Sequence, residues 1–363
     1  MKFLHLFLIV AAPFSLAAAD TATRLQELMK RYPEADANGV GVLTAEEAQT
    51  HANKLRKQKK QSRPQTAKDP ERAGEAQDGA RRPTPTHADV SYGADERNKL
   101  DLWIAKSDRP TPLVVFIHGG GFVNGSKAVA SPEMISGCVD AGVSFMAINY
   151  RYRTTAPIQD ILRDCARSIQ FIRSKAKEYN IDPTRVAVYG GSAGAGTSLW
   201  LAFHPDLADP KNRDPVLRES SRVRAAGALN TQATYNLRRW PEFLPTRPGQ
   251  SFERPGEVTA FYGKTSDAEL DEAKAILDDV DMLSLVSPDD PPVFMYTSQA
   301  DGPVADRGQY LHHPNHARAV KKACDAAGVR ATVFFAQADP RLEGNHLHAL
   351  REFLLAHLKS TAP

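Results

Sequence analysis

One serine stands in a context that suits nucleophilic chemistry. The segment RVAVYGGSAGAGTSLW, residues 185–200, contains Gly190-Gly191-Ser192-Ala193-Gly194, which fits G-x-S-x-G. A run of β-formers precedes the serine and a small-residue helical pattern follows it, which is the context of a nucleophile elbow. Gly190 and Gly194 suit a sharp turn because glycine tolerates strained backbone and close approach. The alternative is a tight turn that happens to contain a serine.

A second glycine-rich segment, FIHGGGFVNGSK, lies upstream at the end of an apolar strand pattern. Acyl transfer builds negative charge on a carbonyl oxygen, and preorganised backbone N–H groups stabilise that charge. We therefore assign the oxyanion donors to Gly120, Gly121 and the amide of Ala193, with His118 orienting the loop rather than acting as a base. The alternatives are a flexible turn or a phosphate loop, but no complete G-x-x-x-x-G-K-[ST] or G-x-G-x-x-G pattern supports a nucleotide site.

Hydrophobic patterns between about residues 89 and 358 predict the elements that position these residues. Buried strands are predicted at 112–117, 143–152, 185–189, 223–230, 291–298 and 331–336. Helices are predicted at 158–179, 316–328 and 348–358. Such alternation predicts an α/β fold with a mostly parallel sheet and helices on both faces.

Composition excludes some classes of protein. The chain has 363 residues and a formal net charge of +3, which does not indicate a nucleic-acid partner. Three cysteines are too few for a disulfide scaffold, and the odd number leaves at least one thiol free or paired with another chain. Cys165 lies on an apolar helical face and is expected in the core.

The N-terminus has the layout of a secretory signal peptide. Residues 1–19 combine an early Lys2, an apolar stretch and small residues at Ala17 and Ala19, so cleavage is expected before Asp20. The apolar run is shorter than the roughly 20 residues that a membrane anchor needs. The sequence therefore predicts a secreted or periplasmic protein without a stable membrane span.

Residues 20–53 resemble a helix–loop–helix of the EF-hand type. The loop matches the calcium-binding pattern at Asp36, Asn38, Gly41, Leu43 and Glu47. Val40 stands where an oxygen ligand is expected, so the segment is either a weakened Ca²⁺ site or a decayed hand that keeps its shape. Residues 54–88 are basic and proline-rich with almost no large apolar side chains, which predicts a disordered linker. A catalytic domain is predicted over residues 89–363.

The motifs together resemble a known family. IHGGGFVNGSK, INYRY, NIDPTRVAVYGGSAGAG and SPDDPPVF are similar to segments of HGGG-bearing carboxylesterases of the α/β-hydrolase fold, both the hormone-sensitive-lipase-like and the feruloyl- and acetylxylan-esterase-like branches. The resemblance implies a Ser-Asp-His triad in that chain order, a small cap over the pocket, and no cofactor for catalysis. The segment NYRYRTTAPIQD lacks the family's second signature, which leaves the substrate open.

The resemblance also suggests the acid and the base. The family places the acid after the strand that follows SPDDPP, which implies Asp301, with Asp306 as the alternative. The base belongs on the loop before the closing helix, where the family's Gly-x-His pattern favours His346 over His348. Asp301 would hold the imidazole in the useful tautomer.

Two further segments have signals that are less specific for a role in the site. The stretch after Asp301 is longer than is usual in the family, and its histidines shape the pocket or have no role: His312, His313 and His316. No ligand spacing there supports a metal site. Residues 231–262 are expected over the pocket mouth, where aromatic side chains either stack on a sugar or aryl group or pack an irregular loop.

These residues predict a serine esterase that acts on small-molecule or polysaccharide esters, with acetyl and feruloyl groups as the candidate acyl groups. The alternatives are a serine peptidase of the same fold and a catalytically degenerate binding protein. Neither the ester nor the oligomeric state follows from the sequence.

Overall fold

A computed structural model of the chain describes residues 30, 32, 35, 36, 42–44, 47, 50, 81–247, 250, 252–338 and 344–359. Residues 1–69 and 70–363 form separate units. In the first unit Thr44 and Glu47 form a reciprocal capping box, with the Glu47 N–H donating to Thr44 Oγ1 at 3.2 Å. Most of the residues of the predicted EF-hand loop and all of those of the signal peptide lie outside the described residues, so these assignments stay predictions.

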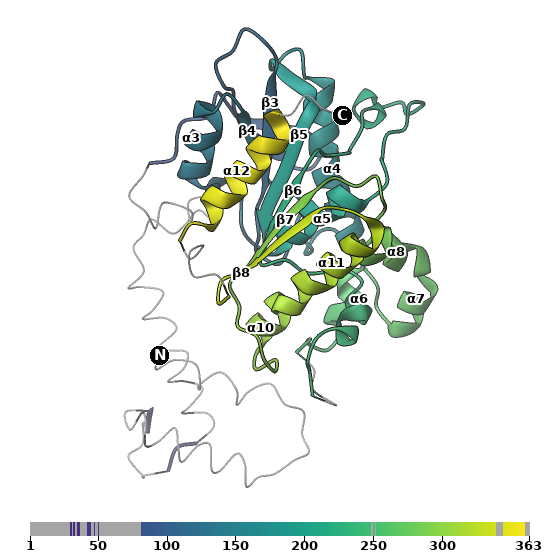
Figure 1. The fold of residues 1–363 in the computed structure, drawn as a ribbon. Helices are drawn as coiled ribbons and strands as arrows, with labels where there is room; N and C mark the ends of the chain where they lie inside the picture. The colour runs from purple at the N-terminus through teal and green to yellow at the C-terminus, as the bar shows by residue number, and fades with distance from the viewer. Residues whose placement is uncertain are drawn as a thin grey trace. The chain divides into compact units, whose positions relative to one another are not determined.

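The described part of the second unit is built on a sheet of eight strands in the order β1-β2-β4-β3-β5-β6-β7-β8 (Figure 1). The strands are β1 (His87–Ser91), β2 (Lys99–Trp103), β3 (Thr111–Ile117), β4 (Ser144–Ile148), β5 (Ile181–Gly191), β6 (Ala226–Leu229), β7 (Val293–Thr297) and β8 (Ala331–Phe335). β1 and β2 pair antiparallel, β2 also runs antiparallel to β4, and the remaining neighbours are parallel. The predicted mostly parallel sheet is confirmed.

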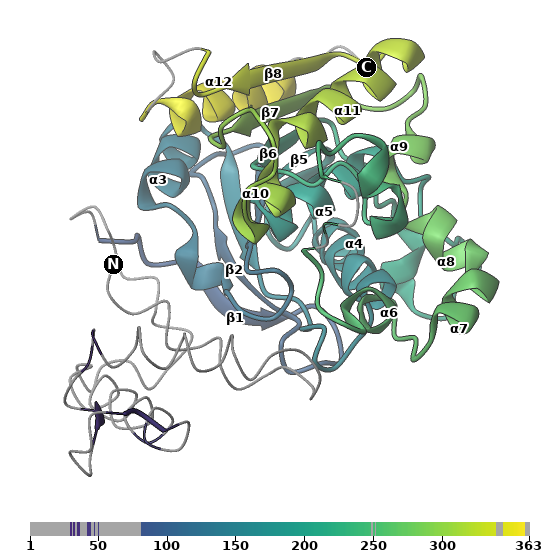
Figure 2. The same ribbon diagram turned by 90° about the horizontal axis from the view of Figure 1, so that it is seen from below.

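Helices cover both faces of this sheet (Figure 2). One face packs against α4 (Ile158–Ser174), α5 (Ala193–Phe203) and α11 (Pro314–Ala327). The other packs against α3 (Pro132–Asp140) and α12 (His346–Lys359). The sequence of β3 is continuously apolar because the strand is buried on both faces of the sheet. Val114 and Phe116 face one hydrophobic core, while Leu113, Val115 and Ile117 face the other.

The remaining helices are short. They are the 3₁₀ helices η4 (Lys127–Val129), η5 (Pro215–Arg218) and η6 (Leu237–Glu242), and the α-helices α6 (Glu257–Phe261), α7 (Asp267–Glu272), α8 (Lys274–Asp279), α9 (Met282–Leu285) and α10 (Arg307–His312). The segment from η6 to α9 is the cap expected from the sequence. It is small because it is built from short helices joined by turns.

The domain built on the sheet begins before residue 89, where the sequence predicted its start. β1 starts at His87, and Trp103 Nε1 donates to the carbonyl of Pro83 at 2.9 Å. The predicted linker therefore ends earlier, because residues 81–88 already contact the sheet. All three cysteines are buried and free, and Cys165 lies in the core as expected. Among the described residues, no helix is both long enough and apolar enough to cross a membrane.

Candidate active site

The turn that carries Ser192 joins the end of β5 to the start of α5. Ser192 has φ 53° and ψ −119°, a sparsely populated conformation for a residue other than glycine. The turn is held against β3, since a Cβ at either Gly190 or Gly194 would overlap the carbonyl oxygen of Ile117. The Ser192 N–H donates to the carbonyl of Leu229 on β6 at 2.9 Å. These contacts project the serine from the carboxyl end of the sheet.

The glycine loop after β3 lies directly beside this turn. A Cβ at Gly119 would come 2.7 Å from the carbonyl oxygen of Gly191. Gly120 and Gly121 have φ of +107° and +60°, which favours glycine at both positions. Within the described residues the backbone N–H groups of Gly120, Gly121 and Ala193 have no hydrogen-bond acceptor. The predicted donors therefore lie next to Ser192 and are free to bind an anionic oxygen.

His118 anchors the glycine loop through contacts with Gly119 and Tyr150. Its ring is fully buried and stacks on Tyr150 with 4.1 Å between ring centroids, while its Nδ1 donates to the carbonyl of Gly119 at 2.7 Å. The hydroxyl of Tyr150 donates to the His118 carbonyl at 2.7 Å. Burial lowers the pKa of His118 to about 4, so the ring is neutral near pH 7. Its position matches the predicted orienting role.

The imidazole next to Ser192 belongs to His312, the last residue of α10. Ser192 Oγ lies 3.3 Å from His312 Nε2. His312 Nδ1 lies 2.9 Å from the carbonyl oxygen of Asn230 and 3.1 Å from Gln232 Nε2. Nδ1 can donate to the first or accept from the second, but not both. The shorter contact favours Nδ1–H, which leaves Nε2 as the acceptor facing the serine.

The carbonyl that orients His312 is itself held in place. Asn230 follows β6 with φ 53°, and its N–H donates to the carbonyl of Tyr296 at 2.7 Å. Its side-chain Oδ1 accepts from the N–H and the hydroxyl of Ser298, at 2.8 and 3.0 Å. Burial lowers the pKa of His312, opposed by its hydrogen bond to Asn230. The unprotonated form that a general base needs is thereby favoured.

The acid and base suggested by the family resemblance lie elsewhere. Asp301 is exposed and forms a two-point ion pair with Arg318 of α11, at 2.6 and 2.5 Å; the hydrogen bond from Arg318 lowers the pKa of Asp301. His346 begins α12, and its ring stacks on Tyr296 at 4.5 Å. Its Nδ1 is buried without a hydrogen-bond partner among the described residues. Ser192, His346 and Asp301 therefore form none of the hydrogen bonds of a triad here.

The two alternatives have local roles. Asp306 is the N-cap of α10 and accepts from the Gln309 N–H at 2.9 Å. His348 Nδ1 lies 2.8 Å from a guanidinium nitrogen of Arg351. Neither contacts Ser192.

Sequence reasoning assigned no catalytic role to His312. The signal was the cluster of histidines at 312, 313 and 316, and the structure separates their roles. His313 caps α11 and its Nε2 contacts the Gly302 carbonyl at 2.9 Å. His316 is fully buried; its Nδ1 accepts from the Ala233 N–H at 3.1 Å and its Nε2 donates to the Tyr310 carbonyl at 3.0 Å. His316 thus holds the segment that carries Gln232 against α10.

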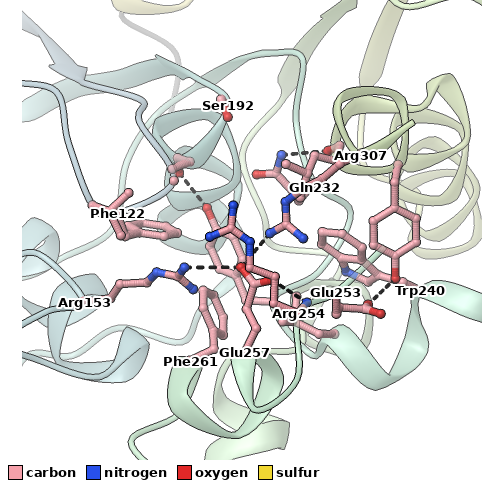
Figure 3. A pocket seen from close by; sticks show the side chains of 17 residues that line it. Phe122, Arg153, Ser192, Gln232, Trp240, Glu253, Arg254, Glu257, Phe261 and Arg307 are labelled. Carbon is pink, nitrogen blue, oxygen red and sulfur yellow. Dashed lines mark hydrogen bonds and ion pairs between the residues drawn. The ribbon is translucent and has the colours of Figure 1, made fainter. Parts of the chain in front are cut away.

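A pocket of about 300 Å³ opens above Ser192 (Figure 3). Its apolar wall consists of Phe122, Tyr235, Leu237, Trp240, Phe261 and Leu311. Its charged wall consists of Arg153, Glu253, Arg254, Glu257 and Arg307. Most of these residues come from the segment 231–262 that was expected over the pocket mouth. In the described part of the chain no group of three or more His, Cys, Asp and Glu side chains could hold a metal ion.

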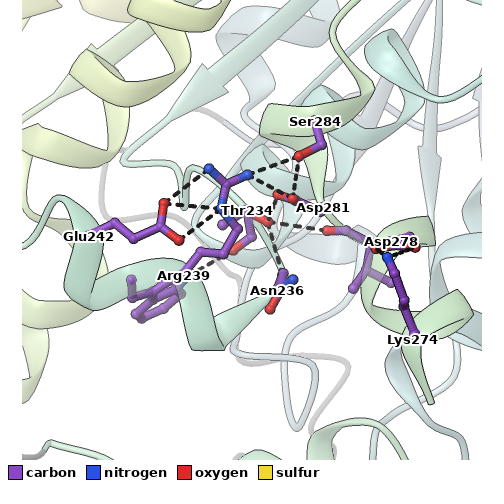
Figure 4. Close-up of polar contacts among 10 residues, drawn as sticks. Thr234, Asn236, Arg239, Glu242, Lys274, Asp278, Asp281 and Ser284 are labelled. Carbon is purple, nitrogen blue, oxygen red and sulfur yellow. Dashed lines mark hydrogen bonds and ion pairs between the residues drawn. The ribbon is translucent and has the colours of Figure 1, made fainter. Parts of the chain in front are cut away.

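A polar network fixes the apolar wall to the rest of the cap (Figure 4). Arg239 of η6 pairs with Asp281 at 2.7 Å, and Thr234 Oγ1 donates to the same carboxylate at 2.8 Å. Trp240 Nε1 donates to the Thr234 carbonyl at 2.9 Å. Of the aromatic residues in the segment 231–262, Tyr235, Trp240 and Phe261 line the pocket. Three others pack within the protein: Phe243 on His316, Phe252 on Tyr310, and Tyr262 in the core.

Comparison with known proteins places this geometry in a family. The BD-FAE family model matches residues 100–313. A probable isoprenylcysteine alpha-carbonyl methylesterase of Arabidopsis thaliana is 31% identical over 151 residues, covering 41% of this chain and 31% of that protein. The probable carboxylic ester hydrolase LipM of Mycobacterium tuberculosis is 32% identical over 142 residues, covering 38% and 32%. The chain thus spans about a third of the length of these relatives.

Solved structures share the fold at lower identity. A truncated carbohydrate esterase from gut microbiota has a TM-score of 0.59 and 20% identity, covering 79% of this chain and 100% of that chain. An acetyl ester-xyloside bifunctional hydrolase from Caldicellulosiruptor lactoaceticus has a TM-score of 0.54 and 21% identity, covering 71% and 87%. Because the family model matches more than half of the chain and these structures share its sheet, the chain belongs to the BD-FAE family and has the α/β-hydrolase fold.

Proposed function

We propose that this protein is an exported serine esterase that hydrolyses carboxylic esters. The observation that carries the proposal is the contact between Ser192 and His312, made in a strained turn beside the glycine loop and at the base of a pocket. The names of the relatives, which are a methylesterase and a carboxylic ester hydrolase, support the same reaction class. Export rests on the predicted signal peptide alone.

The residues act in this order. His312 Nε2 removes the proton from Ser192 as its Oγ attacks the ester carbonyl carbon, and the carbonyl electron pair moves onto oxygen. The N–H groups of Gly120, Gly121 and Ala193 stabilise this oxyanion. When it collapses, the C–O bond to the alcohol breaks and protonated His312 gives its proton to the leaving oxygen. Water, activated in the same way, then hydrolyses the acyl-enzyme.

The carbonyl of Asn230 takes the place of the carboxylate in this scheme. It fixes the tautomer and orientation of His312, which is one of two tasks of a triad aspartate. The other task is electrostatic support of the imidazolium, and a neutral carbonyl supplies less of it than a charged carboxylate. A Ser192–His312 dyad is therefore expected to turn over more slowly than a full triad.

His346 with Asp301 remains the second candidate for the base and acid. The buried Nδ1 of His346 has no partner among the described residues, which is uncommon for a buried ring nitrogen and suits a side chain that bonds in another state. His346 forms no hydrogen bond with Ser192 in the structure. Separate substitution of the two histidines distinguishes the candidates.

The substrate is proposed to carry a short acyl group, including acetyl or feruloyl esters of polysaccharides, because the pocket is small and has an aromatic wall. The test is hydrolysis of p-nitrophenyl esters from acetate to decanoate, and of a feruloyl ester, by the wild type and by Ser192→Ala. We expect serine-dependent turnover of the short esters and labelling of Ser192 by a fluorophosphonate probe. Turnover of amides alone would indicate a peptidase, and a folded protein that neither labels nor turns over would indicate a binding protein.

A further inference from the structure

The pocket above Ser192 contains more charge than hydrolysis of a neutral ester requires. Three arginines line it, Arg153, Arg254 and Arg307, which we call the arginine cluster. We propose that this cluster binds a carboxylate on the substrate, so that the enzyme selects anionic esters over neutral ones. The proposal rests on the proposed esterase function and names the class of ester.

The balance of charge in the pocket favours an anion. The three guanidinium groups face two carboxylates, Glu253 and Glu257, which leaves one positive charge in excess. Glu257 is shared, with Arg153 at 3.2 Å and Arg307 at 2.5 Å. Burial raises the pKa of Glu257, but the Arg254 N–H and the two guanidinium groups together hold it below its ordinary value. Glu257 therefore stays ionised and holds Arg153 and Arg307 in place without neutralising both.

Arg254 supplies the cation that is not used by the protein itself. Its backbone N–H donates to Glu257 at 3.0 Å, but its exposed guanidinium has no ion-pair partner among the described residues. Figure 3 places the guanidinium groups of the arginine cluster around Glu257, on the side of the pocket across from Ser192. A carboxylate there can accept charge-assisted hydrogen bonds from Arg254 and from a neighbouring guanidinium.

The apolar wall limits what connects the two ends of such a substrate. Phe122, Tyr235, Trp240 and Phe261 line the same pocket as Ser192 and the arginine cluster, and aromatic rings of this kind pack on sugar rings and aryl groups. The structure assigns the pocket to an ester whose sugar or aryl body carries a carboxylate. The carboxylate belongs to either the acyl or the alcohol part.

A purely structural role for the arginines makes a different prediction. Arg153 and Arg307 would then serve to anchor α6 through Glu257, and Arg254 would have no role. Substitution of Arg254 separates the two explanations because its guanidinium makes no contact that folding needs.

The experiment compares isosteric pairs of esters that differ in one charge. 4-Acetoxybenzoate and 4-acetoxybenzamide test the alcohol side, and monomethyl terephthalate and methyl 4-carbamoylbenzoate test the acyl side. For at least one pair we expect kcat/KM to favour the anion by roughly tenfold, as for one charge-assisted contact. Arg254→Gln should reduce this ratio at least several-fold, while the matched control Arg330→Gln, an exposed arginine outside the pocket, should leave the ratio unchanged.

A binding measurement keeps the two proposals separate. Calorimetry with Ser192→Ala protein compares 4-hydroxybenzoate and terephthalate with their neutral amides. Arginine-dependent binding of an anion without turnover of any ester would support the carboxylate site and overturn the esterase. Turnover with equal kcat/KM within both pairs, unaffected by Arg254→Gln, would overturn the carboxylate site and keep the esterase.

Discussion

The two sides of the candidate active site are positioned by different kinds of structure. On the nucleophile side, the turn after β5 and the glycine loop after β3 lie on adjacent parallel strands, and close backbone packing determines which residues can stand there. On the base side, the imidazole comes from α10, 120 residues after Ser192 in the chain, and is oriented by a main-chain carbonyl. Local steric demands leave a motif in the sequence, whereas a side chain that arrives from a distant loop leaves almost none.

The largest difference in kcat/KM is expected between variants of the two candidate histidines. We expect His312→Ala to lower kcat/KM by about 10²–10⁴, as for loss of a general base, and His346→Ala to lower it by less than about tenfold. Parallel measurement of both variants on one p-nitrophenyl ester, with circular dichroism to verify folding, makes the comparison. The reverse order of effects would assign the base to His346.

On the nucleophile side, substitution of a packed glycine should reduce stability and activity by disrupting backbone packing, without removing a catalytic group. Gly194→Ala places a methyl group on the carbonyl of Ile117, which has no room to move within β3. Overpacking of this kind costs about 1–3 kcal/mol or more, so we expect a lower melting temperature together with lost activity. Gly191→Ala is the matched control for the melting temperature, because Gly191 lies in the same turn without a positive φ and a Cβ there would come no nearer than 4.0 Å to the Leu229 carbonyl oxygen. Equal melting temperatures for Gly194→Ala and the wild type would mean that the turn is looser than described.

The pH profile of kcat/KM should report the base side. His312 acts as a base only when neutral, and burial lowers its pKa below the ordinary value of 6.5. Activity should therefore be retained on lowering the pH through 6.5 and decline only as the pH falls through this lower pKa. A rising limb centred above pH 6.5 would indicate a base with a nearby carboxylate, which is the arrangement expected of His346 with Asp301.

The smallest effect should come from Asp301. Its carboxylate is more than half exposed and pairs with an exposed arginine, and such pairs contribute about 0–1 kcal/mol. Asp301→Asn should change kcat/KM by less than about threefold and barely change the melting temperature. A loss of activity of 10² or more in this variant would show that Asp301 leaves Arg318 to orient the catalytic histidine.

Much of the scaffold was predictable because its signals are local. The apolar run of β3, the helical spacing of Ile158, Ile161, Leu162 and Cys165, and Gly328 at the end of α11 each matched the structure. The short cap helices α7 and α8 were not predicted, since two turns of mixed polar residues have no distinctive period.

The sequence alone determined the fold class, the position of Ser192 and the glycine loop beside it, because sterics admit few residues in a strained turn packed on a neighbouring strand. The tertiary structure decided which histidine meets the serine. The partner of His312 is the main-chain carbonyl of Asn230. Every residue has such a carbonyl, so no side-chain pattern in the sequence could predict this contact. The arginine cluster likewise depends on how the loop after β4, the segment that leads into α6, and α10 converge, because Arg153, Arg254 and Arg307 are far apart in the sequence and Glu257 pairs with two of them.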